Sequence, residues 1–460
     1  METNANNFPA ATNRREFIKK SATVAAAVAS TNIFKTPVYG QNQAPSTGRV
    51  IGANDRISVA VIGVGEGIGK NHLEGIHKAA ADNNTIVVAA ADLFDKRRAW
   101  AVEHAGLKDS DVVAEYKKVL ERKDVDAVVV ATHDVWHSTV AIDALNAGKH
   151  VYSEKPLSRY LQEAYDVEAA VKSTGKTFQV GSQGCSAGTW LKCAELVRDG
   201  KIGTLVWAQG YYCRNSIGGE WNSPPFNIDK DSNAKSIDWE TWQGKVHNKR
   251  DFSADYFHRW RKYYPYCAGI LGDLAPHRLH PIMLATGNPE FPVRVSSIGT
   301  RNIHADKNTP NTVERDVPEH QQLIAEFPSG FLLTLTIGTV NAKSPGAVMY
   351  GHKATLNVGD TRVDLVPERE FSEEIDPANF DGLQQENIRA HEKNWFDCIR
   401  SGKPTNGNID LAVRVQTVLS MGEMSERLRV TCLFDEKTRT ISTADGKKLD
   451  AITYGTLPLS

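Results

Sequence analysis

The stretch RISVAVIGVGEGIGKNHLEGIHKAAADNNTIVVAAAD, residues 56–92, decides the fold. Residues 57–62 are apolar and rich in β-branched side chains, which predicts a buried strand of a parallel sheet. A glycine-rich turn follows, and residues 70–80 then predict a helix. Residues 85–91 predict a second buried strand, which ends at Asp92.

This strand–turn–helix unit predicts a dinucleotide site, because backbone N–H groups and the positive helix end converge on one point that suits a pyrophosphate. Asp92 is placed to bind the ribose hydroxyls of NAD, although the basic residues 96–98 leave NADP as an alternative. Ile68 stands where the motif has its third glycine, so which glycine approaches the phosphates stays open. From this turn we expect cofactor contacts at Gly63, Gly65, Gly67, Ile68 and Gly69.

Length and composition predict two domains and argue against several classes of protein. The chain has 460 residues, too many for one core of usual size. Its 54 basic and 55 acidic residues argue against a nucleic-acid partner, and no apolar stretch is long enough to predict a membrane span. The six cysteines include no Cys-x-x-Cys pair, so we expect no metal site and buried free thiols, with isolated disulfides as the alternative.

The N-terminal residues are typical of an export signal. Residues 13–19, NRREFIK, form a twin-arginine pattern, and a short, mildly apolar stretch follows at 21–30. We therefore expect residues 1–54 to be signal peptide and linker, and the protein to be periplasmic or secreted.

The rest of the chain predicts an α/β fold with two domains. Strands and helices alternate regularly over residues 55–182, which predicts an NAD-binding Rossmann domain with a doubly wound parallel sheet. Residues 183–430 predict an α+β domain for substrate binding and oligomerisation, with an open, mainly antiparallel sheet, and 431–460 a C-terminal extension. We expect the strands of the second sheet at 205–212, 294–301, 321–327, 331–339 and 347–358.

An aromatic segment interrupts the second domain. Five of the nine tryptophans fall between Trp207 and Trp260. Such rings stack on sugars, but they also cover the face of a sheet, and the sequence leaves both interpretations open.

The segment 149–157, KHVYSEKPL, resembles the Gfo/Idh/MocA family of NAD(P)-dependent oxidoreductases, which carries a Glu-Lys-Pro signature. Residues 131–137 (ATHDVWH), 272–277 (GDLAPH) and 391–404 (HEKNWFDCIRSGKP) resemble further family segments, so that the resemblance covers about residues 55–430. Because residues after strand ends rim the ligand site, we expect further cofactor contacts at Thr132, His133, Glu154 and Lys155. The resemblance of residues 131–137 adds His137 to these contacts. The resemblance also implies a homo-oligomer, either a dimer or a tetramer.

Three residues are the expected catalytic group. Hydride removal from a sugar requires a base for the hydroxyl proton and a cation for the developing alkoxide. We expect His277 to be the base, Lys155 the cation, and Asp273 to hold one of them or to bind a sugar hydroxyl. An alternative role for Asp273 is the N-cap of a helix beginning near residue 274. His280 stands where many family members have an aspartate, so it is a candidate for substrate binding or for acid–base chemistry.

We therefore expect an NAD(P)-dependent oxidoreductase that acts on CH–OH groups of a sugar, cyclitol or glycoside, with a tightly bound cofactor. The resemblance extends to exported members such as glucose–fructose oxidoreductase. The superfamily that the chain resembles also includes glycoside hydrolase family 109, whose members use bound NAD for transient C3 oxidation and elimination. A glycosidase is thus the alternative function, and a sugar-binding scaffold is a third.

Overall fold

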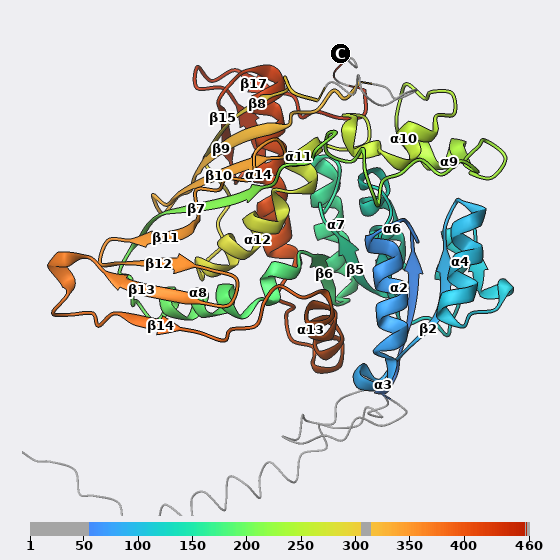
Figure 1. Ribbon diagram of the computed structural model, residues 1–460, viewed down its shortest axis with the longest axis horizontal. Coiled ribbons are helices and arrows are strands. Elements are labelled where there is room, and N and C mark those ends of the chain that lie inside the picture. The colour runs from blue at the N-terminus through green and yellow to red at the C-terminus, as the bar shows by residue number, and fades with distance from the viewer. Residues whose placement is uncertain (1–54, 305–313, 456, 458–460) are drawn as a thin grey trace, which may run out of the picture. The chain divides into compact units, whose positions relative to one another are not determined.

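The computed structural model describes residues 55–304, 314–455 and 457 (Figure 1). The twin-arginine pattern lies outside these residues, so the expected signal stays a prediction.

The N-terminal domain is a six-stranded parallel sheet with the strand order β3-β2-β1-β4-β5-β6. The order reverses between β1 and β4, which is where open sheets of this kind bind their ligands. Its strands are β1 (Ile57–Ile62), β2 (Thr85–Ala91), β3 (Val112–Val113), β4 (Ala127–Val130), β5 (His150–Glu154) and β6 (Phe178–Gly181). Its helices are α2 (Ile68–Lys78), α3 (Ala80–Asn83), α4 (Asp95–Ala105), α5 (Tyr116–Leu120), α6 (Asp134–Asn146) and α7 (Leu161–Thr174).

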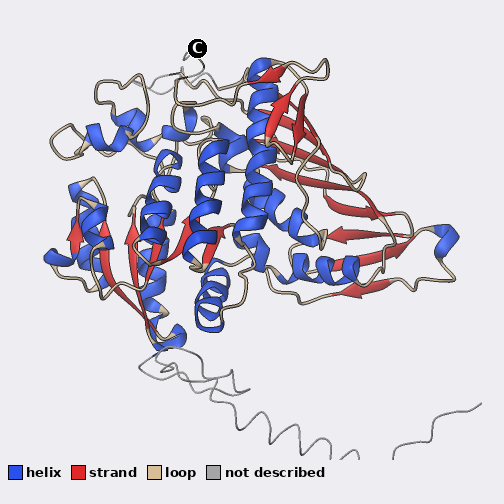
Figure 2. Cartoon of the chain, turned by 180° about the vertical axis from the view of Figure 1, so that it is seen from behind, coloured by secondary structure: helices blue, strands red, loops and turns tan. Residues whose placement is uncertain are grey.

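The second domain is an eleven-stranded sheet in which β7 and β10 pair in parallel and every other pair is antiparallel. Figure 2 shows helices along one side of this sheet, and α8 (Gly188–Arg198), α11 (Gly269–Asp273), α12 (Pro276–Ala285) and α14 (Ile409–Leu428) contact it. The expected fold class is confirmed. The strands are β7 (Leu205–Cys213), β8 (Arg294–Thr300), β9 (His320–Glu326), β10 (Leu332–Gly338), β11 (Ala347–Gly351), β12 (Ala354–Val358), β13 (Val363–Pro367), β14 (Ala378–Phe380), β15 (Cys432–Asp435), β16 (Thr440–Ser442) and β17 (Lys448–Leu449).

Two details of this sheet differ from the sequence prediction. The run expected as a single strand at 347–358 is a hairpin, because the chain reverses at residues 352–353 and β11 pairs with β12. The residues set apart as a C-terminal extension contain β15, which pairs with β8 and continues the sheet through β16 and β17.

The C-terminal part of the chain returns to the N-terminal sheet. Helix α13 (Ile388–Ser401) places Trp395 and Phe396, both fully buried, in one apolar cluster with residues of β1 and β2. On the other side of the sheet, Arg159 and Glu423 form a buried ion pair at 2.7 Å between the start of α7 and helix α14. The two domains therefore share their cores, which holds the carboxyl ends of the parallel strands against the second domain.

All six cysteines are free thiols, and five of them are buried. Within the described residues, no helix combines the length and apolarity that crossing a membrane requires.

The glycine turn is packed tightly against the sheet. Gly63 has φ +91°, and a Cβ there would lie 2.5 Å from the carbonyl oxygen of Ala131 at the end of β4. A Cβ on Gly69 would lie 2.4 Å from the carbonyl oxygen of Gly63. Gly69, one residue later than the usual spacing, therefore provides the close helix–strand contact that the third glycine of the motif makes.

Replacing Gly69 by alanine tests this packing. The added methyl group meets backbone rather than a flexible side chain, so helix α2 must move, and we expect a loss of about 1–3 kcal/mol in the free energy of unfolding. Denaturant unfolding measures this loss, and Lys78→Ala at the exposed end of the same helix is the control. Equal stability of Gly69→Ala and the control would contradict the assignment.

Candidate functional site

Two adjoining cavities lie at the carboxyl ends of the parallel strands. The first, here the dinucleotide cavity, has a volume of about 950 Å³ and includes Gly63, Gly65 and Asp92 in its lining. The second, here the catalytic cavity, has a volume of about 1160 Å³ and includes Lys155, Asp273 and His277. Both are lined by Glu66, Ile68, Thr132, Pro225, Phe226, Trp260 and Arg261, so the two spaces meet beside the glycine turn.

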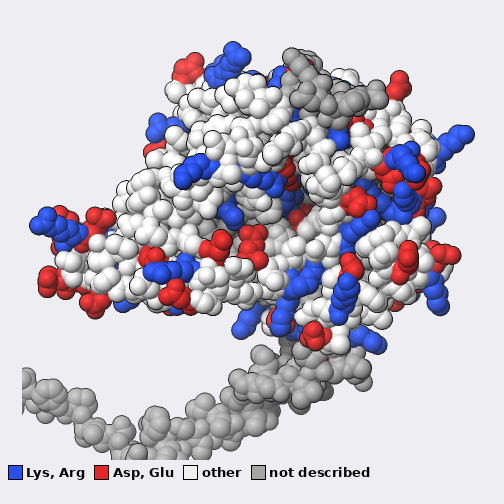
Figure 3. Space-filling view, viewed as in Figure 1, with Lys and Arg blue, Asp and Glu red and all other residues white. Residues whose placement is uncertain are grey.

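Charge is mixed on the face of the molecule that Figure 3 draws. Figure 3 shows basic and acidic side chains interspersed over one face of the molecule, without a large region of one sign.

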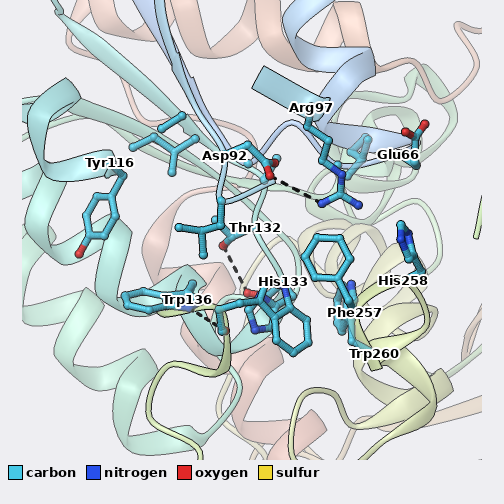
Figure 4. A pocket seen from close by; sticks show the side chains of 18 of the residues that line it. Glu66, Asp92, Arg97, Tyr116, Thr132, His133, Trp136, Phe257, His258 and Trp260 are labelled. Atoms are coloured by element: carbon cyan, nitrogen blue, oxygen red, sulfur yellow. Dashed lines mark hydrogen bonds and ion pairs between the residues drawn. The ribbon is translucent and has the colours of Figure 1, made fainter. Parts of the chain in front are cut away.

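Asp92 organises the dinucleotide cavity. Its Oδ2 accepts a hydrogen bond from the Val64 N–H (2.7 Å) and its Oδ1 accepts one from the Phe94 N–H (2.9 Å). The carboxylate thus joins the glycine turn to the end of β2 and keeps further lone pairs for a ribose. Figure 4 shows Asp92 beside Arg97, with 3.9 Å between the carboxylate and Nη1.

The residues present fit a dinucleotide. A Cβ on Gly65 would meet nothing nearer than the Arg97 guanidinium at 3.7 Å, so the turn is open where a pyrophosphate would lie. Arg97 Nε is buried and has no hydrogen-bond partner in the described part of the chain, which leaves a donor for an anionic ligand. Gly67 is the N-cap of α2 and lines the catalytic cavity. The positive, N–H end of this helix therefore lies beside the same space.

The aromatic segment forms a cover over the dinucleotide cavity. We define the cover as residues 214–266, which carry α9 (Trp239–Gln243) and α10 (Ala254–His258). Trp242 stacks on His133 at 4.2 Å between ring centroids, and Phe257 packs edge-on against Phe94 of the Rossmann domain. The cavity is lined from this side by Pro225, Phe226, Thr241, Trp242, Phe257, His258, Trp260 and Arg261. Trp207 instead stacks on Tyr350 of β11, whereas Trp221 and Trp260 line the catalytic cavity, so sugar stacking by these two rings stays a prediction.

The residues after β4 divide between lining and support. Thr132 lines both cavities, and His133 lines the dinucleotide cavity, where burial lowers its pKa well below the usual range. His137 lies 2.7 Å (Nδ1) from the carbonyl oxygen of Pro156 and 3.1 Å (Nε2) from that of Thr132. His137 also lines the catalytic cavity, and since both ring nitrogens contact backbone carbonyls, it joins the two strand ends.

Lys155 and Asp273 form the central ion pair of the catalytic cavity. Lys155 Nζ donates to Asp273 Oδ1 (2.6 Å) and to the Asp273 carbonyl oxygen (2.7 Å). Arg261 Nε donates to the same Oδ1 (3.0 Å), and Trp221 Nε1 donates to Oδ2 (3.2 Å). Burial alone would raise the pKa of Asp273, but the Arg261 and Lys155 charges lower it far below the usual range, so the carboxylate stays ionised.

Asp273 does not have the alternative role of a helix N-cap that the sequence suggested. The residue ends α11 instead of preceding a helix, and the N-cap of α12 is Ala275. Asp273 is therefore no helix cap, and of the two groups that it was expected to hold it hydrogen-bonds Lys155.

His277 lies near the start of α12 and lines the catalytic cavity. Its Nδ1 is 3.6 Å from Glu386 Oε1, a carboxylate that no motif in the sequence marks. Burial and the nearby Lys155 charge lower the pKa of His277, although Glu386 acts in the opposite direction. The imidazole is thus neutral near pH 7, as a general base must be.

His280, the other candidate in this helix, does not reach the site. It is buried, lies 3.0 Å (Nδ1) from the carbonyl oxygen of Pro276, and is absent from the lining of both cavities. Burial lowers its pKa to about 3. Substrate binding or acid–base chemistry by His280 is therefore contradicted.

Glu154 belongs to a buried network that the sequence does not reveal. Its Oε1 lies 2.9 Å from His72 Nε2, and His72 Nδ1 lies 2.6 Å from Glu392 Oε1. Gln183 Nε2 also donates to Glu154 (3.2 Å). The network joins α2, the end of β5 and α13, so Glu154 lines the catalytic cavity but is held chiefly by His72. Glu154 and Glu392 lie 82 and 320 positions from His72 in the sequence, so no sequence pattern shows this contact.

The charge of His72 makes stability depend on pH. Burial alone would lower the pKa of His72, but the two carboxylates raise it to about 9. Because the folded pKa exceeds the unfolded value, the stabilisation is complete below about pH 6.5 and is lost as the pH rises through about 9. The expected loss is on the order of 3 kcal/mol.

Urea unfolding of the wild type and of His72→Gln between pH 6 and pH 9.5 measures this effect. We expect the variant to be less stable at pH 6 and to lose less stability as the pH rises. His77→Gln, an exposed histidine of the same helix, is the control. A wild-type stability that does not fall over this range would contradict a charged His72.

In the described parts of the chain, no cluster of three or more His, Cys, Asp or Glu side chains could hold a metal ion.

Comparisons with known proteins agree on a family. Residues 57–182 match the oxidoreductase family with an NAD-binding Rossmann fold, and residues 240–357 match the GFO/IDH/MocA C-terminal domain. The chain is 28% identical over 252 residues to an alpha-N-acetylgalactosaminidase from Shewanella oneidensis, which covers 52% of this chain and 51% of the relative. It spans about half the length of the curated relatives that it matches.

Solved structures share the fold. An oxidoreductase domain protein from Kribbella flavida superimposes with a TM-score of 0.66 at 20% identity, over 83% of this chain and 100% of the other. Levoglucosan dehydrogenase in complex with NADH and L-sorbose gives a TM-score of 0.61 at 17% identity, over 81% and 98%. Together with the two matched domains, this fold and the dinucleotide cavity show that the chain belongs to the Gfo/Idh/MocA family and carries its NAD-binding Rossmann fold.

Proposed function

We propose that the protein is an NAD-dependent oxidoreductase that oxidises a CH–OH group of a carbohydrate. One observation carries this proposal: an ammonium group held by a carboxylate and a neutral imidazole face one cavity, and this cavity adjoins the dinucleotide cavity. A scaffold that only binds sugar would not need a cation and a base in this arrangement.

The residues divide the chemistry between them. NAD, when bound, supplies the hydride acceptor. His277 takes the hydroxyl proton of the substrate, since its lowered pKa keeps the imidazole neutral. Lys155 stabilises the negative charge that develops on the oxygen, and Asp273 fixes the direction of its ammonium group. The Arg261 charge keeps that carboxylate ionised.

The cover supports a cofactor that stays bound between turnovers. Eight of its residues line the dinucleotide cavity, and its apolar cluster packs on Phe94 and Val135 of the Rossmann domain. Release of a dinucleotide would require this packing to open.

The similarity to an alpha-N-acetylgalactosaminidase favours a second candidate function. A retained cofactor that is reduced and reoxidised within one turnover would also serve an NAD-dependent glycosidase, through transient C3 oxidation and elimination. The same Lys155 and His277 would act in the first step of both reactions.

We also propose export and self-association. Residues 13–19 support export through the twin-arginine route, and a folded-protein route suits an enzyme that must carry its cofactor with it. Replacing both Arg14 and Arg15 by lysine should retain the protein in the cytoplasm; unchanged export would contradict this.

Ile298 and Ile324 are 74% and 48% exposed on neighbouring strands, which supports a homo-oligomer that light scattering should detect.

Lys155→Met tests the catalytic assignment. We expect the variant to keep its dinucleotide but to lose nicotinamide reduction by on the order of 10³-fold, because the charge that stabilises the alkoxide is gone. Rapid mixing with a reactive carbohydrate, followed in the near ultraviolet, measures the rate. Lys172→Met, an exposed position on α7, is the control. A variant that reduces nicotinamide at the wild-type rate would remove Lys155 from the mechanism.

Phe226→Ala tests the cover. The ring lines both cavities and is only partly buried, so we expect the fold to survive and the cofactor to dissociate during gel filtration. The absorbance ratio at 260 and 280 nm before and after filtration reports retention. Phe380→Ala, on the edge strand β14, should retain cofactor like the wild type. Wild-type protein purified without dinucleotide would contradict a retained cofactor.

A further inference from the structure

His277 has a carboxylate partner that does not line the catalytic cavity. Glu386 Oε1 lies 3.6 Å from His277 Nδ1, and Glu386 Oε2 accepts a hydrogen bond from Arg278 Nη1 (3.2 Å). Arg278 is held in turn, because its Nε donates to the Tyr211 carbonyl oxygen (3.2 Å). The carboxylate is therefore fixed by two neighbouring residues of α12, although it belongs to the segment before α13.

A further cavity lies beyond this carboxylate. We call it the outer hollow, a space of about 770 Å³ that includes Glu386, Arg278, Tyr211 and Trp190 in its lining. Glu386 is absent from the lining of the catalytic cavity, and His277 is absent from the lining of the outer hollow. The Glu386 side chain is 34% exposed and that of His277 is 19% exposed. The pair thus joins the catalytic cavity to a second, solvated space.

The charges around His277 come from several elements. Lys155 at the end of β5 lowers its pKa, together with burial, while Glu386 and Asp273 raise it. Glu154 and His280 lie within electrostatic range, Tyr212 of β7 packs its ring 5.6 Å from the imidazole, and Arg278 is the adjacent residue. Burial alone would raise the pKa of Glu386, but its contact with His277 lowers it, so the carboxylate is ionised beside the imidazole.

We propose that Glu386 is the positioning residue and proton acceptor of His277, and that the outer hollow is the exit for the proton of the reaction. This inference rests on the proposed function. Glu386 holds the tautomer in which Nδ1 carries the proton, which leaves the Nε2 lone pair for the catalytic cavity. The 3.6 Å separation shortens when the imidazole becomes charged.

The proton balance is complete. The substrate O–H bond breaks and the proton forms a bond to Nε2, while the C–H electron pair leaves as hydride to the nicotinamide and the substrate becomes a carbonyl compound. The N–H bond at Nδ1 then breaks, its proton passes to Glu386, and the carboxylic acid releases it to water in the outer hollow. Lys155 and Asp273 hydrogen-bond each other and take no part in this transfer.

The variant Glu386→Gln tests the inference in the full-length protein. The amide keeps the shape but removes the charge that raises the pKa of His277, so NMR of histidine-labelled protein should show the His277 titration shifted to lower pH. His277→Asn identifies the signal. This readout needs no turnover, and a simple loss of packing would not produce the shift. In single-turnover mixing, the acid limb of the pH–rate profile should shift in the same direction.

The rate itself should fall by on the order of tenfold, a part of the about 10²- to 10⁴-fold that a positioned base contributes. Glu386→Asp keeps the charge and should restore the pH profile in part. Glu370→Gln, an exposed position between β13 and β14, is the matched control and should behave as the wild type.

An unshifted His277 titration in Glu386→Gln would overturn the inference, as would an unshifted pH–rate profile with a normal rate. These outcomes are distinct from failure of the proposed function. If no carbohydrate reduces the cofactor of the wild type, the oxidoreductase proposal fails, and the NMR titration alone decides whether Glu386 governs His277.

Discussion

The contact between Lys155 and Asp273 is the interaction on which the site depends. Lys155 follows β5 of the Rossmann domain, and Asp273 ends α11 of the second domain, so this ion pair crosses between the domains. It is largely buried, and a buried ammonium or carboxylate without its partner would cost several kcal/mol. The rest of the fold must therefore keep the two domains in register for this pair to form. The result is an ammonium group fixed in the lining of the catalytic cavity.

Two other buried networks supply this register. His72 of α2 lies between Glu154, which is the residue before Lys155, and Glu392 of α13. This network joins α2, the end of β5 and α13. Arg159 and Glu423 join α7 to α14 on the other side. The cover adds a third connection through the stacking of Trp242 on His133. These polar and aromatic contacts consequently hold the cofactor site and the catalytic residues together.

Much of this fold follows from the sequence because its signals are local. Strands β1 and β2 begin and end at the predicted residues, since short apolar runs between glycine and polar turns determine them. The hairpin of β11 and β12 was missed because an uninterrupted alternating pattern does not show where a chain reverses. Motif residues such as Lys155, Asp273 and His277 share the cavity as expected, whereas His72, Glu386 and the cover's role depend on contacts between distant segments. His280 shows the converse, because its place in the motif suggests chemistry but the turn of α12 directs it into the core.

The most direct test of the account mixes purified, unsupplemented protein with a panel of sugars and aryl glycosides. The near-ultraviolet band of reduced nicotinamide and the release of aglycone are followed together. The account predicts that at least one carbohydrate produces this band without added cofactor, either as a lasting stoichiometric rise in a dehydrogenase or as a transient during steady aglycone release in a glycosidase. A protein that carries dinucleotide but never reduces it with any member of the panel would contradict carbohydrate oxidation by this site.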